Sequence, residues 1–343
     1  MFETPGYSEV LDTYIAYGIV ESLVRAGAEE LTLIPLGNKY RIKTENFDGS
    51  LEKGILNALE DMLSLHKAFG RPSPKEGGKI ISDVDFSAGA NINNVYWDGI
   101  PRTLERIKND LRKSNSKLSQ KKSIPVPITL MPTAGKYIPK TFDMEKGNPI
   151  KIDDLNYVLA WMGFHYFTPY INVSTKGATY IHIYAIKPTK TINLLEVLAL
   201  KDLKKKISDY YIRDSNFFMY MKTTLLYHMA HTESIGALET ILKKQFTVVA
   251  YTLERIGNNQ AVRAFGEYDI SKLMDFLWYL KKENPYYSIQ FVDTLLHSGT
   301  EVSIAFVDAI LYDDFDSIYN VFRKLKINVN PSIIKAIQGW FND

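Results

Sequence analysis

HYFTPYINVSTKGATYIHIYAIKP, from His165 to Pro188, is the stretch that decides the fold. Two runs rich in β-branched and aromatic residues flank STKGA (Ser174–Ala178), which contains a lysine and a glycine. This pattern predicts two strands joined by a short loop. Because side chains alternate along a strand, the second run places two sets of residues on opposite faces. These sets are Tyr180, His182, Tyr184 and Ile186 on one face, and Ile181, Ile183 and Ala185 on the other.

A helix and another hairpin are predicted nearer the N-terminus. Ser8 can cap a helix in which Leu11, Ile15, Ile19 and Leu23 are spaced four residues apart, and Gly27 would end it. LTLIPL and KYRIKT flank the dipeptide Gly37-Asn38, which is typical of a two-residue hairpin turn. Both features indicate antiparallel strands combined with helices in this part of the chain.

Three further helices are predicted between the two hairpins, over 51–69, 101–113 and 153–161. Pro101 suits the first turn of the second of these helices, because proline lacks the amide proton that would be unpaired there. IPVPITLMP (124–132) contains three prolines and is therefore expected to be an edge strand or a connector.

After Pro188 the pattern becomes mostly helical. Helices are predicted over 194–211, 217–231, 234–244, 270–282, 289–297, 302–311, 315–325 and 332–341. QFTVVAYTL (245–253) fits either a strand or a helix. The sequence thus predicts an α+β protein, with an N-terminal mixed α/β part that contains antiparallel hairpins and a C-terminal, mostly helical bundle. The boundary is expected between 190 and 212, which gives domains 1–200 and 201–343.

Composition restricts the function classes. The chain has 343 residues, of which 45% are hydrophobic and 23% charged, as in ordinary globular proteins. It contains no cysteine, which excludes disulfides, thiolate catalysis and cysteine-based zinc sites. The N-terminus has no secretory signal pattern, and no apolar run reaches the length of a membrane span, so a cytoplasmic protein is expected.

Positive charge is concentrated in one tract. Between Arg102 and Lys122 there are eight basic and two acidic residues, a net charge of +6 in 21 residues. The whole chain carries only +2, so the other 322 residues sum to −4. Arg102, Arg106 and Lys113 lie near one stripe of the predicted helix, where they could meet successive phosphates. A solvated helix face is the alternative interpretation.

Other polar segments add candidates for nucleic-acid contact. The small residues and asparagines of SAGANINN, directly before the basic tract, could approach a sugar, phosphate or base edge closely. The lysines of ALKDLKKK, the turn RIGNNQAVR and the lysine of STKGA could also grip phosphate, although each is equally typical of an exposed helix face or turn. The candidates are Asn91, Asn93, Asn94, Arg102, Arg106, Lys108, Arg112, Lys113, Lys117, Lys121, Lys122, Lys176, Lys204, Lys205, Arg255, Asn258, Asn259 and Arg263.

Enzymatic motifs are scarce. The sequence contains no GxxxxGK[ST], GxGxxG or GxSxG motif. A metal-dependent nuclease could use Asp83 and Asp85, or His228 and His231, but neither pair has a third ligand at a recognised spacing. We therefore expect no enzymatic activity, no metal and no cofactor. The acidic C-terminal third would repel phosphate, so protein contacts are expected there, and a protein-only scaffold is a further alternative.

Three segments resemble one protein family. GYSEVLDTYIAYGIVESLVRAG (6–27), SAGANINNVYWDGIPRTLERIK (87–108) and FTPYINVSTKGATYIHIYAIKP (167–188) are similar to the large subunit of the archaeal type I-A CRISPR interference complex. The resemblance extends over nearly the whole chain. It rests on no catalytic signature.

The resemblance implies a non-catalytic subunit of a crRNA-guided antiviral surveillance complex (Cascade). Such subunits help to recognise the protospacer-adjacent motif, stabilise the opened target duplex and recruit the helicase and nuclease. The implied partners are target DNA, the crRNA-containing complex, its backbone and small subunits, and the helicase and nuclease. The implied layout is an α/β N-terminal part followed by a helical bundle.

Overall fold

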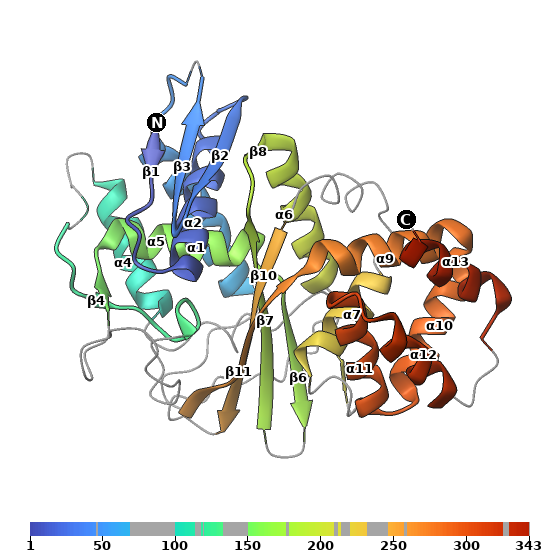
Figure 1. Cartoon of the computed structure of the whole chain (residues 1–343). Coiled ribbons are helices and arrows are strands. Elements are labelled where there is room, and N and C mark those ends of the chain that lie inside the picture. The colour runs from blue at the N-terminus through green and yellow to red at the C-terminus, as the bar shows by residue number, and fades with distance from the viewer. Residues whose placement is uncertain are drawn as a thin grey trace.

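The computed structural model describes residues 1–45, 47–68, 100–113, 118, 120–132, 150–175, 178–208, 212–213, 220–231, 246–256, 259–324 and 329–342. Its fold is α+β, as the sequence predicts. Antiparallel sheets and helices form the N-terminal part, and the C-terminal region is mostly helical (Figure 1).

A five-stranded sheet lies at the centre of the molecule, in the order β11-β10-β7-β6-β9 (Figure 1). The strands are β6 (Tyr170–Thr175), β7 (Ala178–Pro188), β9 (Ile212–Arg213), β10 (Phe246–Ile256) and β11 (Asn259–Asp269). All neighbours are antiparallel except β6 and β9. The predicted hairpin at 165–188 is confirmed as β6 and β7. The ambiguous segment 245–253 is a strand, and this strand pairs with β7 across the boundary expected near residue 200.

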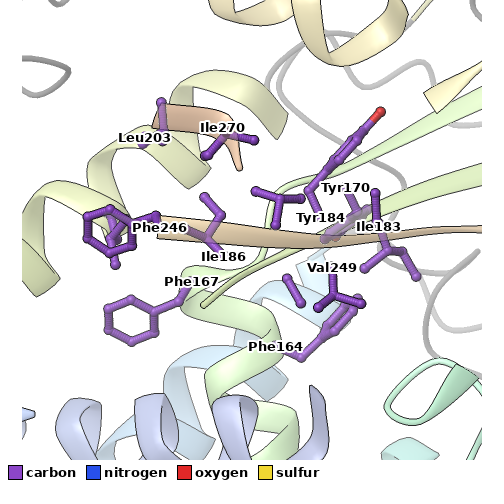
Figure 2. Close-up of a cluster of buried hydrophobic side chains, with 14 of the residues drawn as sticks. Phe164, Phe167, Tyr170, Ile183, Tyr184, Ile186, Leu203, Phe246, Val249 and Ile270 are labelled. Atoms are coloured by element: carbon purple, nitrogen blue, oxygen red, sulfur yellow. The ribbon is translucent and has the colours of Figure 1, made fainter. Parts of the chain in front are cut away.

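Two helices cover one face of this sheet, α1 (Glu9–Arg25) and α5 (Asp154–Phe167). The Tyr251 hydroxyl on β10 lies 2.7 Å from the Tyr14 hydroxyl on α1, and the Tyr17 hydroxyl donates to the carbonyl of Ile186 over 2.5 Å. Figure 2 shows Phe164 and Phe167 of α5 on this side of the strands. All these side chains are buried, so the sheet and the two helices share one core.

The other face meets the C-terminal helices. The Tyr184 hydroxyl donates to the carbonyl of Met221, at the start of α7 (Met221–His231), over 2.7 Å. Figure 2 shows Tyr184 and Ile270 on the side opposite Phe164. The bundle consists of α7, α9 (Ile270–Glu283), α10 (Pro285–His297), α11 (Thr300–Leu311), α12 (Phe315–Lys324) and α13 (Pro331–Asn342). Its core includes Phe276, whose ring contacts those of Phe306 and Trp340.

A smaller sheet packs beside α1, in the order β1-β3-β2-β8. Its strands are β1 (Phe2–Glu3), β2 (Leu31–Leu36), β3 (Lys39–Thr44) and β8 (Ile192–Asn193). Gly37 adopts φ +69°, which allows the two-residue turn between β2 and β3. The remaining N-terminal elements are α2 (Leu51–Ala68), α4 (Ile100–Arg112), α6 (Leu194–Ser208) and a two-stranded ladder of β4 (Ile124–Pro125) and β5 (Lys151–Ile152).

Several predicted boundaries are confirmed, and the predicted end of the helix over 153–161 is wrong. The first helix begins after Ser8, which accepts a hydrogen bond from the Leu11 amide. The predicted helix 153–161 continues to Phe167, so His165 is helical and not part of a strand layer. The segment 124–132 begins as β4, an edge strand of its two-stranded ladder as predicted, and turns at 128–130. None of the helices in the described ranges is long and apolar enough to cross a membrane.

Candidate nucleic-acid interface

The basic helix α4 packs through Leu104 and Ile107, which are buried. On its outer side the Arg106 guanidinium donates two hydrogen bonds to Asp154, of 3.0 and 2.7 Å. Asp154 is the first residue of α5, and its side chain is only 3% exposed. The bond to Asp154 is the main cause that raises the pKa of Arg106. Arg106 therefore fastens α4 to α5.

Three other basic side chains of the tract are also paired. Lys108 is 7% exposed and lies 2.5 Å from Glu105, and Lys113 lies 3.1 Å from Asp110. Arg112 binds Glu60 of α2 through two nitrogens, at 2.5 and 3.1 Å. Glu60 and Asp154 lie outside the tract, so its net charge of +6 is partly neutralised by carboxylates that are distant in sequence. Phosphate would have to compete with these partners for the same nitrogens.

The rest of the tract is described only in part. Lys121 and Lys122 are exposed, and the Lys122 ammonium lies 5.0 Å from the centre of the Tyr7 ring. Lys117 and the side chain of Arg102 lie outside the described residues, as do Asn91, Asn93 and Asn94. For these five residues nucleic-acid contact stays a prediction.

Strand pairing brings two of the predicted segments together at one end of the five-stranded sheet. Thr175 pairs with Ala178, on either side of the turn that contains Lys176. Thr179 pairs with Arg255, and Ile256 pairs with Asn259 one position further along. The hairpin β6–β7 and the hairpin β10–β11 therefore end side by side, at the lower edge of the sheet in Figure 1. Lys176 and Asn258 themselves, and the side chains of Arg255 and Asn259, lie outside the description.

An arginine that the sequence did not nominate lies at the same end. Arg213 of β9 pairs with Ser174 of β6 in parallel. Strand β9 has only two residues, so the sequence has no alternating pattern that could predict this strand. Strands β6, β7, β9 and β10 thus place the backbone of Arg213, the backbone of Arg255 and the two residues that flank 176–177 at one end of the sheet. The side chain of Arg213 is not described.

Arg263 is the predicted residue whose side chain is best defined at this end. Thr252 pairs with Ala264 and Leu253 with Val262, so Arg263 is the additional residue of a β-bulge. Its Nε donates to Glu254, and the Tyr180 hydroxyl donates to the other oxygen of this carboxylate over 3.0 Å. Burial, followed by the bond to Glu254, raises the pKa of Tyr180.

Two lysines of α6 have partners within the fold. Lys201 binds the buried Glu21 of α1 at 2.8 and 2.9 Å. The ammonium of Lys204, one of the predicted residues, lies 5.6 Å from the centre of the Tyr170 ring. Lys205 lies on the same helix, but its side chain is not described.

The side chains of the metal-site alternative lie outside the described part of the chain. Asp83 and Asp85 lie outside the described residues, and α7 carries His228 and His231, whose side chains are not described. Within the described part of the chain, His, Asp and Glu form no group of three that could hold a metal ion. The arrangement that brings candidates from separate segments together is the strand register at the sheet end.

Comparison with known proteins identifies the family. The family model described as "CRISPR-associated protein (Cas_Csa4)" matches residues 1–343. A protein of Methanocaldococcus jannaschii named "CRISPR-associated protein Cas8a2/Csa4" is 61% identical over 350 residues, an alignment that covers all of this chain and 93% of the relative. These matches confirm the resemblance to a type I-A CRISPR large subunit. The chain belongs to the Csa4 family of CRISPR-associated proteins.

Proposed function

We propose that this protein is the non-catalytic, DNA-binding large subunit of a crRNA-guided type I-A surveillance complex. In this role it helps to recognise the protospacer-adjacent motif, stabilises the opened target duplex and recruits the helicase and nuclease. Guide pairing reads the target sequence, whereas protein contacts the adjacent motif and the sugar–phosphate backbone. Family membership supports the CRISPR context of this proposal.

One observation carries the DNA-binding part of the proposal. The strand register brings the ends of the β6–β7 and β10–β11 hairpins to one end of the sheet. Three basic strand positions lie toward the same end, although they are far apart in sequence: Arg213, Arg255 and Arg263. Rigid strands hold basic groups at fixed spacing, which suits phosphates that are themselves regularly spaced. We expect a smaller contribution from the basic tract 102–122, because four of its side chains already bind carboxylates.

We also propose that the C-terminal helices contact the other subunits. Their surface combines exposed tyrosines with carboxylates, and tyrosine is enriched at protein interfaces. Three of these tyrosines, Tyr286, Tyr312 and Tyr319, are more than half exposed. Such a surface would repel DNA and suits a protein partner.

DNA binding over a salt series tests the proposal. The purified protein is titrated into labelled duplex, and into the same duplex with an unpaired centre, and anisotropy gives the affinity. Replacing Lys176 and Arg255 with alanine should reduce the slope of log affinity against log salt by about 1.8 on duplex, because each lost phosphate contact contributes about 0.9. A matched variant, Arg112→Ala with Lys113→Ala, removes two paired charges and should change the slope by less than about 0.5.

Two results would contradict the proposal. Absence of binding by the wild-type chain at low salt, both alone and within the reconstituted crRNA complex, would remove the DNA-binding role. Equal slope changes in the two double variants would remove the sheet end as the preferred contact. Addition of the chain to the complex should also increase its preference for targets that carry the adjacent motif.

A further inference from the structure

We propose that Arg263 is a pre-oriented phosphate contact and that Glu254 is its positioning residue. The inference rests on the proposed DNA-binding function and assigns a residue pair to it. The ligand is a backbone phosphate of nucleic acid. A search for basic residues does not find Glu254, because a carboxylate repels phosphate and is not expected in a nucleic-acid interface.

The backbone directs Arg263 away from the regular strand pattern. It is the additional residue between the pairs Thr252–Ala264 and Leu253–Val262. Bulges insert one unpaired residue, bend the strand locally and re-aim a side chain. They are frequent at sheet edges and beside functional sites, and β11 is an edge strand of its sheet.

Among the described residues, the Arg263 side chain is held through its Nε nitrogen. Arg263 donates from Nε to Glu254, so the two terminal nitrogens of the guanidinium lie beyond this bond. The Arg263 side chain is 52% exposed, whereas that of Glu254 is only 11% exposed. A largely buried carboxylate therefore fixes the inner edge of a guanidinium whose outer edge is exposed.

Glu254 is itself restrained. The Tyr180 hydroxyl donates to Oε1, and Arg263 donates to Oε2. Tyr180 lies directly opposite Glu254 in the β7–β10 ladder, so both groups belong to rigid strands. A guanidinium with two parallel terminal donors binds phosphate in a bidentate manner, and prior orientation reduces the entropy lost on binding.

The position of the pair agrees with this ligand. Glu254 is adjacent to Arg255 and lies two residues before the end of β10, at the sheet edge proposed to meet DNA. A phosphate at the outer edge of Arg263 would thus lie near this end of the sheet, on the face that Glu254 shares with Tyr180, whereas Arg255 belongs to the opposite face because successive residues of a strand alternate. Orientation by a carboxylate also explains why an arginine, and not a lysine, serves this position.

Variants of Arg263 and Glu254 test the inference in the same anisotropy assay. Arg263→Ala should weaken duplex binding about tenfold at fixed salt and reduce the slope by about 0.9. Arg263→Lys keeps the charge and should keep the slope, but should weaken binding about threefold because bidentate geometry is lost. In a Glu254→Ala background, arginine and lysine at position 263 should bind equally, since the positioning group is absent.

Arg41→Ala is the matched control. Arg41 also donates from Nε to a carboxylate, Glu3, at 2.7 Å, but it lies in the small sheet. Its substitution should leave DNA affinity and slope unchanged. Thermal unfolding of every variant verifies folding, and Arg263→Lys serves if Arg263→Ala fails to fold.

The results separate the two proposals. If the wild-type chain binds DNA and Arg263→Ala equals Arg41→Ala, the inference is wrong and the DNA-binding function stands. The inference is also wrong if the difference between arginine and lysine persists without Glu254. Loss of assembly with the other subunits, with DNA affinity unchanged, would assign Arg263 to a protein carboxylate instead and overturn it.

Discussion

Asp154 binds Arg106 of the basic tract and gives this arginine a structural role. Its carboxylate is buried at the first position of α5, where the helix dipole favours negative charge, and it receives two hydrogen bonds from Arg106. Glu60 has the same type of partner in Arg112, but both of these side chains are more than 40% exposed. Water can replace the arginine at Glu60 far more readily than at Asp154.

Arg106→Ala is therefore expected to destabilise the protein more than Arg112→Ala. Loss of Arg106 leaves a buried carboxylate with fewer donors, at a cost of about 2 kcal/mol in the free energy of unfolding. Loss of Arg112 breaks an exposed pair and should cost less than about 1 kcal/mol. Urea unfolding of the two variants provides the comparison. Equal losses would mean that burial of Asp154 does not govern the strength of its pair.

The same residues mark a limit of sequence analysis. The positive tract is visible in sequence because its eight charges are contiguous. Its neutralisation is not visible, because Glu60 and Asp154 approach from helices that lie 52 and 48 residues away along the chain. Charge clustering therefore predicted where basic side chains lie, but not which of them have carboxylate partners.

At the level of elements, the contact of α1 with α5 depends on two glycines. A Cβ atom at Gly163 would lie 1.8 Å from the carbonyl oxygen of Tyr14, and one at Gly18 would lie 2.0 Å from that of Leu159. Both obstacles are backbone atoms, which cannot move aside as a flexible side chain can. The glycines therefore set the separation of the two helices that cover the central sheet.

Gly163→Ala should consequently separate α1 from α5 and destabilise the protein by about 2–3 kcal/mol, which is typical of an overpacked core. Gly339→Ala is its control, because Gly339 also lies in a helix, α13, and a Cβ there meets nothing within 4 Å. This second substitution should be neutral or stabilise by up to about 1 kcal/mol through helix propensity. Thermal and urea unfolding measure both, and a neutral Gly163→Ala would contradict the close-packing argument.

Elements that begin or end at a cap or a turn are predictable from sequence, whereas a helix buried on all sides is less so. The cap at Ser8 and the turn at Gly37-Asn38 fixed α1 and the β2–β3 hairpin from sequence alone. Helix α5 is buried along nearly its whole length, so its apolar residues show no period, and its aromatic end was assigned to a strand. Pro169 marks its true end, since the residue before a proline disfavours the helical conformation.

At the scale of the molecule, the central sheet connects the two halves of the chain. The strands of 246–269 and those of 170–188 lie side by side in one sheet and meet where β10 pairs with β7, with α1 and α5 on one face and α7 on the other. The expected boundary near residue 200 therefore falls within a region whose sheet uses segments from both sides. Sequence patterns do not show this pairing, because its partners lie 58 to 76 residues apart and leave no local periodicity.

A chain that ends at residue 208 should not fold cooperatively. It would lack β10 and β11, which leaves β7 as an unpaired edge and uncovers Tyr14, whose hydroxyl binds that of Tyr251. Exposed, apolar edge strands promote aggregation. We expect no sharp thermal transition in circular dichroism, together with increased light scattering, although every residue of the expected N-terminal domain is present.

Removal of residues 331–343 is the control for this truncation. It deletes α13 and with it the hydrogen bond of 2.7 Å from the Trp340 indole to Asp275, but it leaves every strand of the sheet in place. This shorter chain should melt at a lower temperature in a single transition, because the sheet and the α1–α5 pair remain complete. A cooperative transition for residues 1–208 at the temperature of the full chain would instead show that β10 and β11 are dispensable, and that the N-terminal part is an independent domain.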